Sequence, residues 1–537
     1  MAVEMRAEAS QSRRPVGSLL RLAAEDWTRS HAAIAAGLAL AVALTWLLAH
    51  GRYRLPIILV VVLWYLFGDL RKVFVSSILL IGMSPIVLLS PAIGWRLDEY
   101  LLPVLLARWI MWVSRHPRER HPFWLGTPVA VYLLALWISA ASNASAGLAA
   151  SPHADALYYL FTLMKPLQWV AWFFIAQQLL HEQRVQRWAA GAVAVTLLTV
   201  CLIGVAQYLD ICGMRDVIRG IYPIVRQHGA IVPASMLGAQ RATSTFGQPN
   251  WFASFIAAGV PLIFVLGALL RPAMRLGLAL LAVPAVFLAL CYSGSRGGMF
   301  AATLGLLVFG ALRFRRRRSG AGFAVVAALI VTAISLAPHF AAPQQREYGM
   351  MAKRYPTSPG FIENILADPR LPAWRYFSGV FFRHPFFGDG AAEIVDNQYL
   401  FILVRYGLVG FIAFLVLLSQ LLRTGWIAWR RHHGGAGEGI AAAVLAAIVA
   451  VLANGVSDAP LQTHRTMELF WLLAAFAVVL ASRQAESRGF SETPSTARQM
   501  SRSSAPQRQR GGVCYSTEAD RLTERPRARP GGKAADG

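Results

Sequence analysis

The sequence predicts an all-α, polytopic integral membrane protein, and three observations support this fold class. Of the 537 residues, 56% are hydrophobic and only 15% are charged, which is unlike a soluble globular protein. Apolar segments of roughly 17–25 residues, the length needed to cross a bilayer, recur along most of the chain. Basic residues gather in runs between these segments, as they do in the loops of membrane proteins.

The apolar segments number about fourteen, of which the first four are short. Residues 1–30 lack an apolar core followed by small residues, so we expect no cleavable signal peptide there, and the first helix would serve as a signal anchor. The expected helices span residues 33–49, 55–69, 74–92, 99–113, 126–147, 157–180, 188–208, 250–270, 273–292, 297–313, 321–337, 398–422, 438–455 and 466–482.

The basic runs set the expected topology. The formal net charge is +24, but the charge is divided among short loops and the tail, which argues against nucleic acid as a partner. Short loops rich in Lys and Arg stay in the cytoplasm, so both termini are expected there, and residues 209–249 and 338–397 become long periplasmic loops. The basic runs are Arg71-Lys72 and residues 115–121, 181–187, 313–318 and 429–433.

Three regions are expected along the chain: a cytoplasmic segment at 1–30, a multi-pass transmembrane domain at 31–482, and a tail at 483–537. The tail is rich in Arg, Ser, Pro and Gly without apolar periodicity, which predicts a disordered, basic cytoplasmic segment. The cysteines show neither metal-ligand spacing nor a disulfide framework, and no metal or other cofactor is expected. They are Cys201, Cys212, Cys291 and Cys514.

Ionisable residues at membrane depth are costly and are therefore candidates for function. Lys165 lies near the middle of an apolar helix beside Pro166; the alternative is a lysine whose amine only reaches for the membrane surface. Arg296 lies in a tight turn between two helices, where Gly297 and Gly298 would let a ligand approach closely. The alternative for Arg296 is a charged turn residue without function.

Arginines also occur where the topology does not call for positive charge, in the two long outer loops and inside an apolar helix. Guanidinium groups bind phosphate bidentately, and a lipid diphosphate would place its charge at the headgroup level. A polyprenyl-diphosphate-linked sugar is therefore the expected ligand. The residues expected to bind its diphosphate or sugar are Arg241, Arg296, Arg370, Arg375, Lys165 and Arg405.

Glycosyl transfer is the chemistry that fits such a ligand: arginines stabilise the departing diphosphate, and one base deprotonates the incoming hydroxyl. Asp396 is placed to be that base, because it lies where a loop runs without a break into the apolar helix expected at 398–422. His384 and His464 are further candidates for the base. No spacing of acids or histidines indicates a metal site.

Four segments, in their order and spacing, resemble one family. They are RATSTFGQPNWFASFIA at 241–257, SGSRGGMFAA at 293–302, PRLPAWRYFSGVFFRHPFFGDG at 369–390 and DNQYLFILVRYGLVG at 396–410. Together they resemble the bacterial O-antigen ligase and O-antigen polymerase superfamily, which includes protein O-oligosaccharyltransferases. The resemblance covers roughly residues 160–480. The motif positions with a structural role are Gly247, Pro249, Asn250, Gly388, Gly390, Asn397 and Gly407. Pro249 and Asn250 suit the start and cap of one helix, Asn397 suits the cap of another, and Gly388 and Gly390 would shape the turn before it.

The resemblance implies a GT-C-like, metal-independent, inverting glycosyltransferase of the bacterial inner membrane, with undecaprenyl-diphosphate-linked glycan as donor. Asp396 stands where the ligases carry histidine, and Arg405 stands where many members carry glutamate. The Asp-Asn pair is more similar to polymerases of exopolysaccharide, capsule or O-antigen repeat units, for which the acceptor is also lipid-linked. A chain-length regulator and a flippase would then be expected partners.

Two alternatives stay open. The first is a ligase that transfers the glycan to lipid A core or to a secreted protein. The second is a polysaccharide transporter or flippase, in which Lys165, Arg296 and Arg405 line a substrate path. Transporters usually contain repeated groups of helices, and no such repeat is visible in this sequence.

Overall fold

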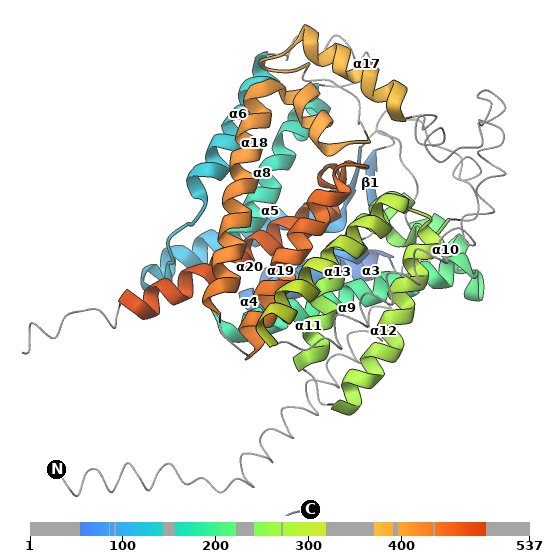
Figure 1. The fold of residues 1–537 in the computed structure, drawn as a ribbon, viewed down its shortest axis with the longest axis vertical. Coiled ribbons are helices and arrows are strands. Elements are labelled where there is room, and N and C mark those ends of the chain that lie inside the picture. The colour runs from blue at the N-terminus through green and yellow to red at the C-terminus, as the bar shows by residue number, and fades with distance from the viewer. Residues whose placement is uncertain are drawn as a thin grey trace, which may run out of the picture. The chain divides into compact units, whose positions relative to one another are not determined.

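The computed structural model describes residues 54–84, 86–90, 93–142, 156–221, 241–269, 272–317, 370–389, 396–432 and 435–489. These residues are helical apart from one hairpin and the connecting turns (Figure 1). The chain divides into two compact units, Met1–Ala485 and Glu486–Gly537. Of the second unit, only the last residues of one helix are described.

The first part of the described chain contains six α-helices and a two-stranded sheet. The two strands are antiparallel, with Ile86 opposite Arg96. The elements are α3 (Arg54–Phe67), α4 (Leu70–Met83), β1 (Ile86–Ser90), β2 (Ile93–Arg96), α5 (Leu97–Arg115), η2 (Pro117–Glu119), α6 (Gly126–Ser142), α8 (Ala156–Leu179) and α9 (Gln183–Tyr208).

The second part contains the segments that resemble the family. Its elements are η3 (Ile211–Gly213), α10 (Met214–Ile221), η4 (Ser244–Phe246), α11 (Pro249–Leu269), α12 (Pro272–Ser293), α13 (Arg296–Arg317), α17 (Arg370–Arg383), α18 (Gln398–Arg431), α19 (Gly435–Asn454), η5 (Pro460–Gln462) and α20 (His464–Gly489).

The expected helices are confirmed wherever the structure describes them, with two exceptions: the helix expected at 398–422 is broken at Gly407, and the helix expected at 74–92 is shorter than expected. The helix expected at 74–92 ends at Met83, and the hairpin replaces its second half. Pro85 follows the end of α4, and a proline disfavours helix for the residue before it. Ile86 and Val87 are β-branched residues that suit a strand. The helices expected at 33–49 and 321–337 lie outside the described residues.

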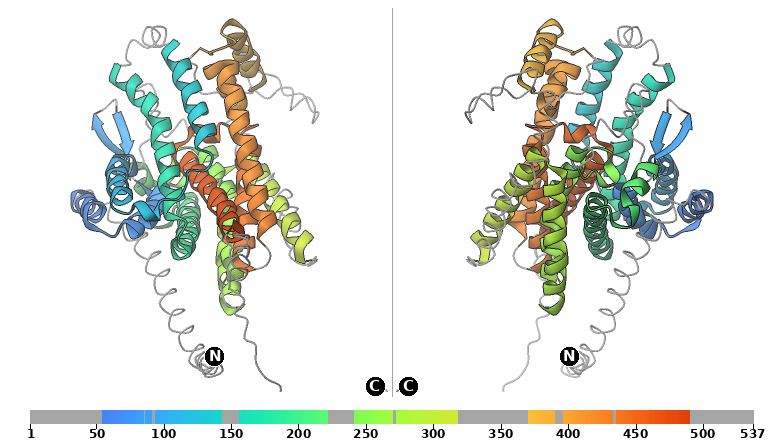
Figure 2. Two further views of the ribbon diagram at one scale, coloured as in Figure 1. Left: turned by 90° about the vertical axis from the view of Figure 1, so that its left-hand side faces the viewer. Right: turned by 90° about the vertical axis from the view of Figure 1, so that its right-hand side faces the viewer.

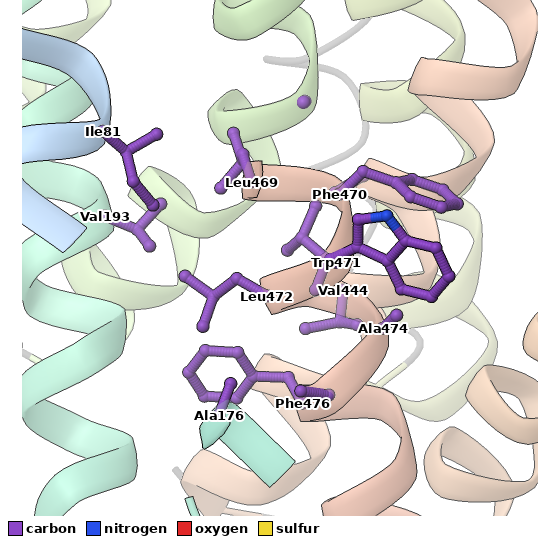
Figure 3. Packing of buried hydrophobic residues seen from close by; sticks show 14 of the residues in the cluster. Ile81, Ala176, Val193, Val444, Leu469, Phe470, Trp471, Leu472, Ala474 and Phe476 are labelled. Atoms are coloured by element: carbon purple, nitrogen blue, oxygen red, sulfur yellow. The ribbon is translucent and has the colours of Figure 1, made fainter. Parts of the chain in front are cut away.

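Helix α20 lies in the middle of the core. Its residues from Arg465 to Ser482 are all buried, and most of them are apolar, as expected for a helix surrounded by others. Figure 3 shows its side chains meeting neighbours from α4, α8, α9 and α19. The residues in contact around α20 include Leu469, Leu472, Phe476, Ile81, Ala176, Val193 and Val444.

Four described helices are long and apolar enough to cross a membrane, which makes the chain a membrane protein by length and composition. These spans are Gln183–Tyr208, Gln398–Arg431, Gly437–Asn454 and His464–Ser482, and four shorter apolar helices accompany them. Figure 2 shows α6, α8 and α18 extending toward the end at which α17 lies; α17 contacts α18. The count of about fourteen spans and the topology remain predictions.

Candidate active site

The turn between α12 and α13 presents Arg296 to the outside of the protein. Arg296 is the first residue of α13, and its side chain is exposed. Ser295 caps the helix, because its Oγ accepts a hydrogen bond from the backbone N–H of Gly298 at 3.3 Å. The first backbone N–H groups of a helix and a guanidinium at the same place favour the binding of an anion.

The glycines that follow Arg296 pack against protein, which corrects the expectation that they make room for a ligand. A Cβ atom at Gly297 would collide with Oγ of Ser457. A Cβ atom at Gly298 would collide with Cβ of Ala253 in α11. Both positions therefore need glycine so that the start of α13 can lie against α11 and against Ser457.

Arg241 is held at the same turn. Its Nε donates to the carbonyl of Ser293 at 2.7 Å, and its Nη2 donates to Oδ1 of Asn250 at 3.1 Å. The structure thus brings Arg241 to the turn that carries Arg296. Pro249 is the first residue of α11, as expected, whereas the side chain of Asn250 contacts Arg241 instead of capping that helix.

The residues after Arg241 are fixed by a glutamine from α9. Oε1 of Gln207 accepts from the backbone N–H groups of Thr243 and Ser244, at 2.9 and 2.7 Å. Gly247 has a φ of +73°, so it provides the left-handed turn between η4 and α11 that favours glycine. The start of the motif is therefore held against α9 where it leads into α11.

The α19–α20 loop (residues 455–463) joins the start of α18 to this region. The backbone N–H of Gln398 donates to the carbonyls of Gly455 and Asp458, at 2.8 and 3.0 Å. Oε1 of Gln398 accepts from the backbone N–H of Leu461 at 3.0 Å. The loop thus connects the fourth motif segment, at the start of α18, with α20.

A buried polar contact links the same loop to α11. Oγ of Ser254 donates to Oδ2 of Asp458 at 3.4 Å and accepts a hydrogen bond from Nδ2 of Asn454. All three residues are buried. Buried polar groups that satisfy one another fix a single arrangement of the helices that carry them.

Arg465 connects α20 to α4 and to the first motif segment. Its guanidinium donates to the carbonyls of Gly82 and Ser84 at 2.9 and 2.7 Å, and to Oγ1 of Thr245 at 2.6 Å. The ring of Phe246 lies 4.9 Å from the guanidinium carbon. This buried arginine therefore ties three separate segments together.

A buried cluster of charges surrounds Arg96 at the end of β2. Its Nη2 lies 2.6 Å from Oε1 of Glu468 and 3.0 Å from Oδ2 of Asp98, and its Nε lies 3.6 Å from Oε1 of Glu99. Burial alone would lower the pKa of Arg96, but the three carboxylates raise it above its usual value. The guanidinium is therefore charged, and it offsets the carboxylates around it.

Lys165 and His464 extend this cluster toward the surface. Nζ of Lys165, from α8, lies 2.8 Å from Nε2 of His464, at the start of α20. Nδ1 of His464 lies 3.5 Å from Oε1 of Glu99. Lys165 lies inside an apolar helix, α8, next to Pro166, as expected. Its contact with His464 could not be predicted from the sequence.

Asn397 begins α18. Its Oδ1 accepts from the backbone N–H groups of Tyr399 and Leu400, and its Nδ2 donates to the carbonyl of Val456 at 3.0 Å. The suggestion that Asn397 caps the helix is therefore confirmed. Asp396 precedes it and is exposed.

Helix α18 is broken at Gly407, which corrects the expectation of an unbroken helix. Gly407 has φ of +66° and ψ of −169°, a conformation that is not helical and that other residues avoid. Leu408 N–H donates to the carbonyl of Pro385 at 2.8 Å, so the segment after α17 fills the break. Gly388, with φ of +71°, lies against the carbonyl of Arg405.

Arg405 lies two residues before the break. Its guanidinium carbon is 5.5 Å from the ring centre of Phe401 and 5.7 Å from that of Tyr406. Ser139 of α6 donates to the carbonyl of Arg405 at 3.1 Å. The guanidinium of Arg405 therefore lies beside two aromatic rings, and its carbonyl helps to hold α6 next to the break.

Helix α17 carries the remaining predicted residues. Arg370 is its first residue, and Arg375 and His384 are exposed. Gly390 lies outside the described residues.

An apolar cavity of about 70 Å³ lies between α11, α12 and α13. Ile263 of α11, Leu290 of α12, and Met299 and Leu306 of α13 line it. Met299 lies about one helical turn beyond Arg296 on α13, so the cavity lining starts one turn from the α12–α13 turn. A charged group above an apolar cavity suits a ligand with an anionic head and a hydrocarbon tail.

The α19–α20 loop was not predicted to be part of the site, although His464, which follows it, was a candidate base. The stretch NGVSDAPLQTHR at 454–465 separates two apolar helices and is dense in polar residues. That density was a usable signal, because polar groups at the ends of buried helices must find partners. The described residues contain no group of three or more His, Cys, Asp or Glu that could hold a metal ion.

Comparison with known families matches part of this region. Residues 279–415 match the family model described as O-antigen ligase, a stretch that runs from α12 into α18. The matched stretch includes Arg296 and the break at Gly407. No curated protein matches the chain in a sequence comparison.

Proposed function

We propose that this chain, whose residues 279–415 match the family model described as O-antigen ligase, polymerises lipid-linked oligosaccharide repeat units into exopolysaccharide, capsule or O-antigen. The chain is a membrane enzyme of the ligase or polymerase type. The donor in the proposal is an undecaprenyl-diphosphate-linked glycan, and the reaction takes place at the outer face of the bacterial inner membrane.

The observation that carries the proposal is the α12–α13 turn above the apolar cavity. Arg296 is exposed at the start of a helix, and Arg241 reaches the same turn through Ser293. The two arginines would bind the diphosphate and stabilise it as it departs, and the cavity lined by Met299 and Leu306 would take the first part of the lipid chain.

The reaction in this proposal is a single displacement at the anomeric carbon. The hydroxyl of the acceptor glycan attacks the anomeric carbon as the bond to the diphosphate oxygen breaks, and a base takes the hydroxyl proton. Asp396 is the base that the sequence suggests, and its exposed position at the start of α18 gives a glycan access. Arg370 and Arg375 on α17 would contact the glycan beyond the reacting sugar.

Polymerase is preferred to ligase because Asp396 replaces the ligase histidine. The ligase reading has its own support, since the matched family is described as O-antigen ligase. The two differ only in the acceptor: a second lipid-linked glycan for the polymerase, and lipid A core or a protein for the ligase.

The purified protein in liposomes separates these readings when it is supplied with lipid-linked repeat units. A polymerase produces a ladder of products from repeat units alone. A ligase produces nothing until lipid A core or a protein acceptor is added, and it then adds one glycan to each acceptor. If the protein only moves intact lipid-linked units across the bilayer, it is a transporter and the proposal is wrong.

A further inference from the structure

The contacts of His464 form a line of three ionisable side chains from three helices. Lys165 of α8 lies 2.8 Å from Nε2, and Glu99 of α5 lies 3.5 Å from Nδ1. The second oxygen of Glu99 accepts from the backbone N–H of Arg96 at 3.1 Å, which fixes the carboxylate. The imidazole therefore lies between an amine and an oriented carboxylate.

The chemistry of these groups determines which nitrogen of the His464 ring carries the proton. A lysine ammonium can only donate hydrogen bonds, so Nε2 accepts from Lys165 when the lysine is charged. The ring proton is then on Nδ1, facing Glu99. At 3.5 Å this contact is long, and Nδ1 of His464 and Oε1 of Glu99 have no other hydrogen-bond partner among the described residues. Catalytic contacts often tighten only when the reaction charges them.

The neighbouring charges are already engaged elsewhere. Asp98 and Glu468 hold Arg96, at 3.0 and 2.6 Å, and Arg96 is more distant from Glu99, at 3.6 Å. Arg465 donates to backbone carbonyls and a threonine on the opposite side. Glu99 is thus the carboxylate that can offset a proton gained by Lys165 or His464.

Exposure along the line increases toward the amine side. The side chain of Glu99 is 5% exposed, whereas that of His464 is 27% exposed, and Lys165 is half-buried. The ring of Trp169 lies 5.7 Å from that of His464. The carboxylate is therefore the member of the line that is most shielded from water, and the imidazole and the amine are the members that an acceptor hydroxyl would reach.

We propose that Lys165, His464 and Glu99 form a proton relay that deprotonates the acceptor hydroxyl. The inference rests on the proposed glycosyl transfer and assigns its base to this relay instead of Asp396. The hydroxyl oxygen bonds to the anomeric carbon, the diphosphate leaves with the electrons of the broken bond, and the hydroxyl proton moves to the unprotonated amine of Lys165. That amine then donates to Nε2 of His464, and Glu99 offsets the added charge.

The decisive variant is Lys165→Arg. Arginine keeps the positive charge but cannot lose its proton in a protein, so it cannot act as a base. General-base catalysis typically contributes 10²–10⁴-fold, so we expect glycan transfer to fall at least about 100-fold while binding of the lipid-linked donor is retained. The matched control is Lys72→Arg, an exposed lysine on α4, for which transfer should not change.

A pH profile separates a relay from a purely structural cluster. In Glu99→Gln the charge that favours the protonated relay is absent, so the acidic limb of the rate profile should move to lower pH and the maximal rate should fall about 10-fold. His464→Gln, with donor binding measured in parallel, should lose transfer to the same extent as Lys165→Arg. Melting temperature and donor binding show whether each variant is folded.

The proposal is overturned if Lys165→Arg transfers glycan at the rate of the unaltered protein. It is also overturned if the acidic limb is unchanged in Glu99→Gln and instead disappears in Asp396→Asn, since the base would then be Asp396. A different failure concerns the proposed function itself: if the unaltered protein transfers no glycan from any lipid-linked donor, the reaction is wrong, whatever the variants do.

Discussion

Replacing Arg96 by methionine tests whether the buried charges are a stabilising part of the fold. Arg96 is 7% exposed and is the cation between Asp98, Glu99 and Glu468. Its removal leaves buried carboxylates without their counter-charge, and breaking a buried pair in this way costs about 3–5 kcal/mol. That is a large part of the roughly 5–15 kcal/mol by which a folded protein is stable.

The comparison is with Arg71→Met on α4. Arg71 lies 2.6 Å from Glu182, a shorter contact than most in the buried cluster, but both side chains are 42% exposed. An exposed pair contributes about 0–1 kcal/mol. Thermal unfolding in detergent should therefore show a large loss of melting temperature for Arg96→Met and little or none for Arg71→Met. Equal losses, or none for Arg96→Met, would refute the electrostatic reasoning.

Three other variants test the local geometry. Gly407→Ala should lower the melting temperature, because the left-handed backbone conformation at this position costs about 1–3 kcal/mol for other residues and the new Cβ collides with the Phe386 carbonyl. The control is Gly191→Ala, in open space on α9, which should be neutral or stabilising. Asn397→Ala should cost about 1 kcal/mol through loss of the cap, as read by the same unfolding assay. Arg296→Ala should weaken binding of the lipid-diphosphate donor roughly 10- to 100-fold, the loss of a charged hydrogen bond; unchanged binding would remove Arg296 from the site.

Local patterns were enough to predict the helices, because each depends on residues close in sequence. Apolar segment length located α9, α19 and α20, Pro249 marked the start of α11, and Asn397 marked that of α18. The hairpin was missed because an apolar run with β-branched residues has the same composition whether it forms helix or strand.

The site depends on contacts between distant residues, and the sequence does not display these. Arg96 and Glu468 are 372 positions apart, and Lys165 and His464 are 299 positions apart. The break in α18 was also hidden, because a glycine inside an apolar segment is tolerated in a helix, and only the segment 385–389 filling the gap makes Gly407 necessary. Lys165 could be singled out from its membrane depth and His464 as a candidate base, but the contact between them could not be predicted.

The central claim is that the chain joins lipid-linked glycans by displacing a lipid diphosphate. The most direct test counts undecaprenyl diphosphate released and glycosidic bonds formed when the protein in liposomes receives repeat units as both donor and acceptor. We expect one lipid diphosphate to be released for each bond formed, a growing ladder of products, and loss of both in Arg296→Ala. A ladder without released diphosphate, or no bond formation with any lipid-linked glycan, would contradict it.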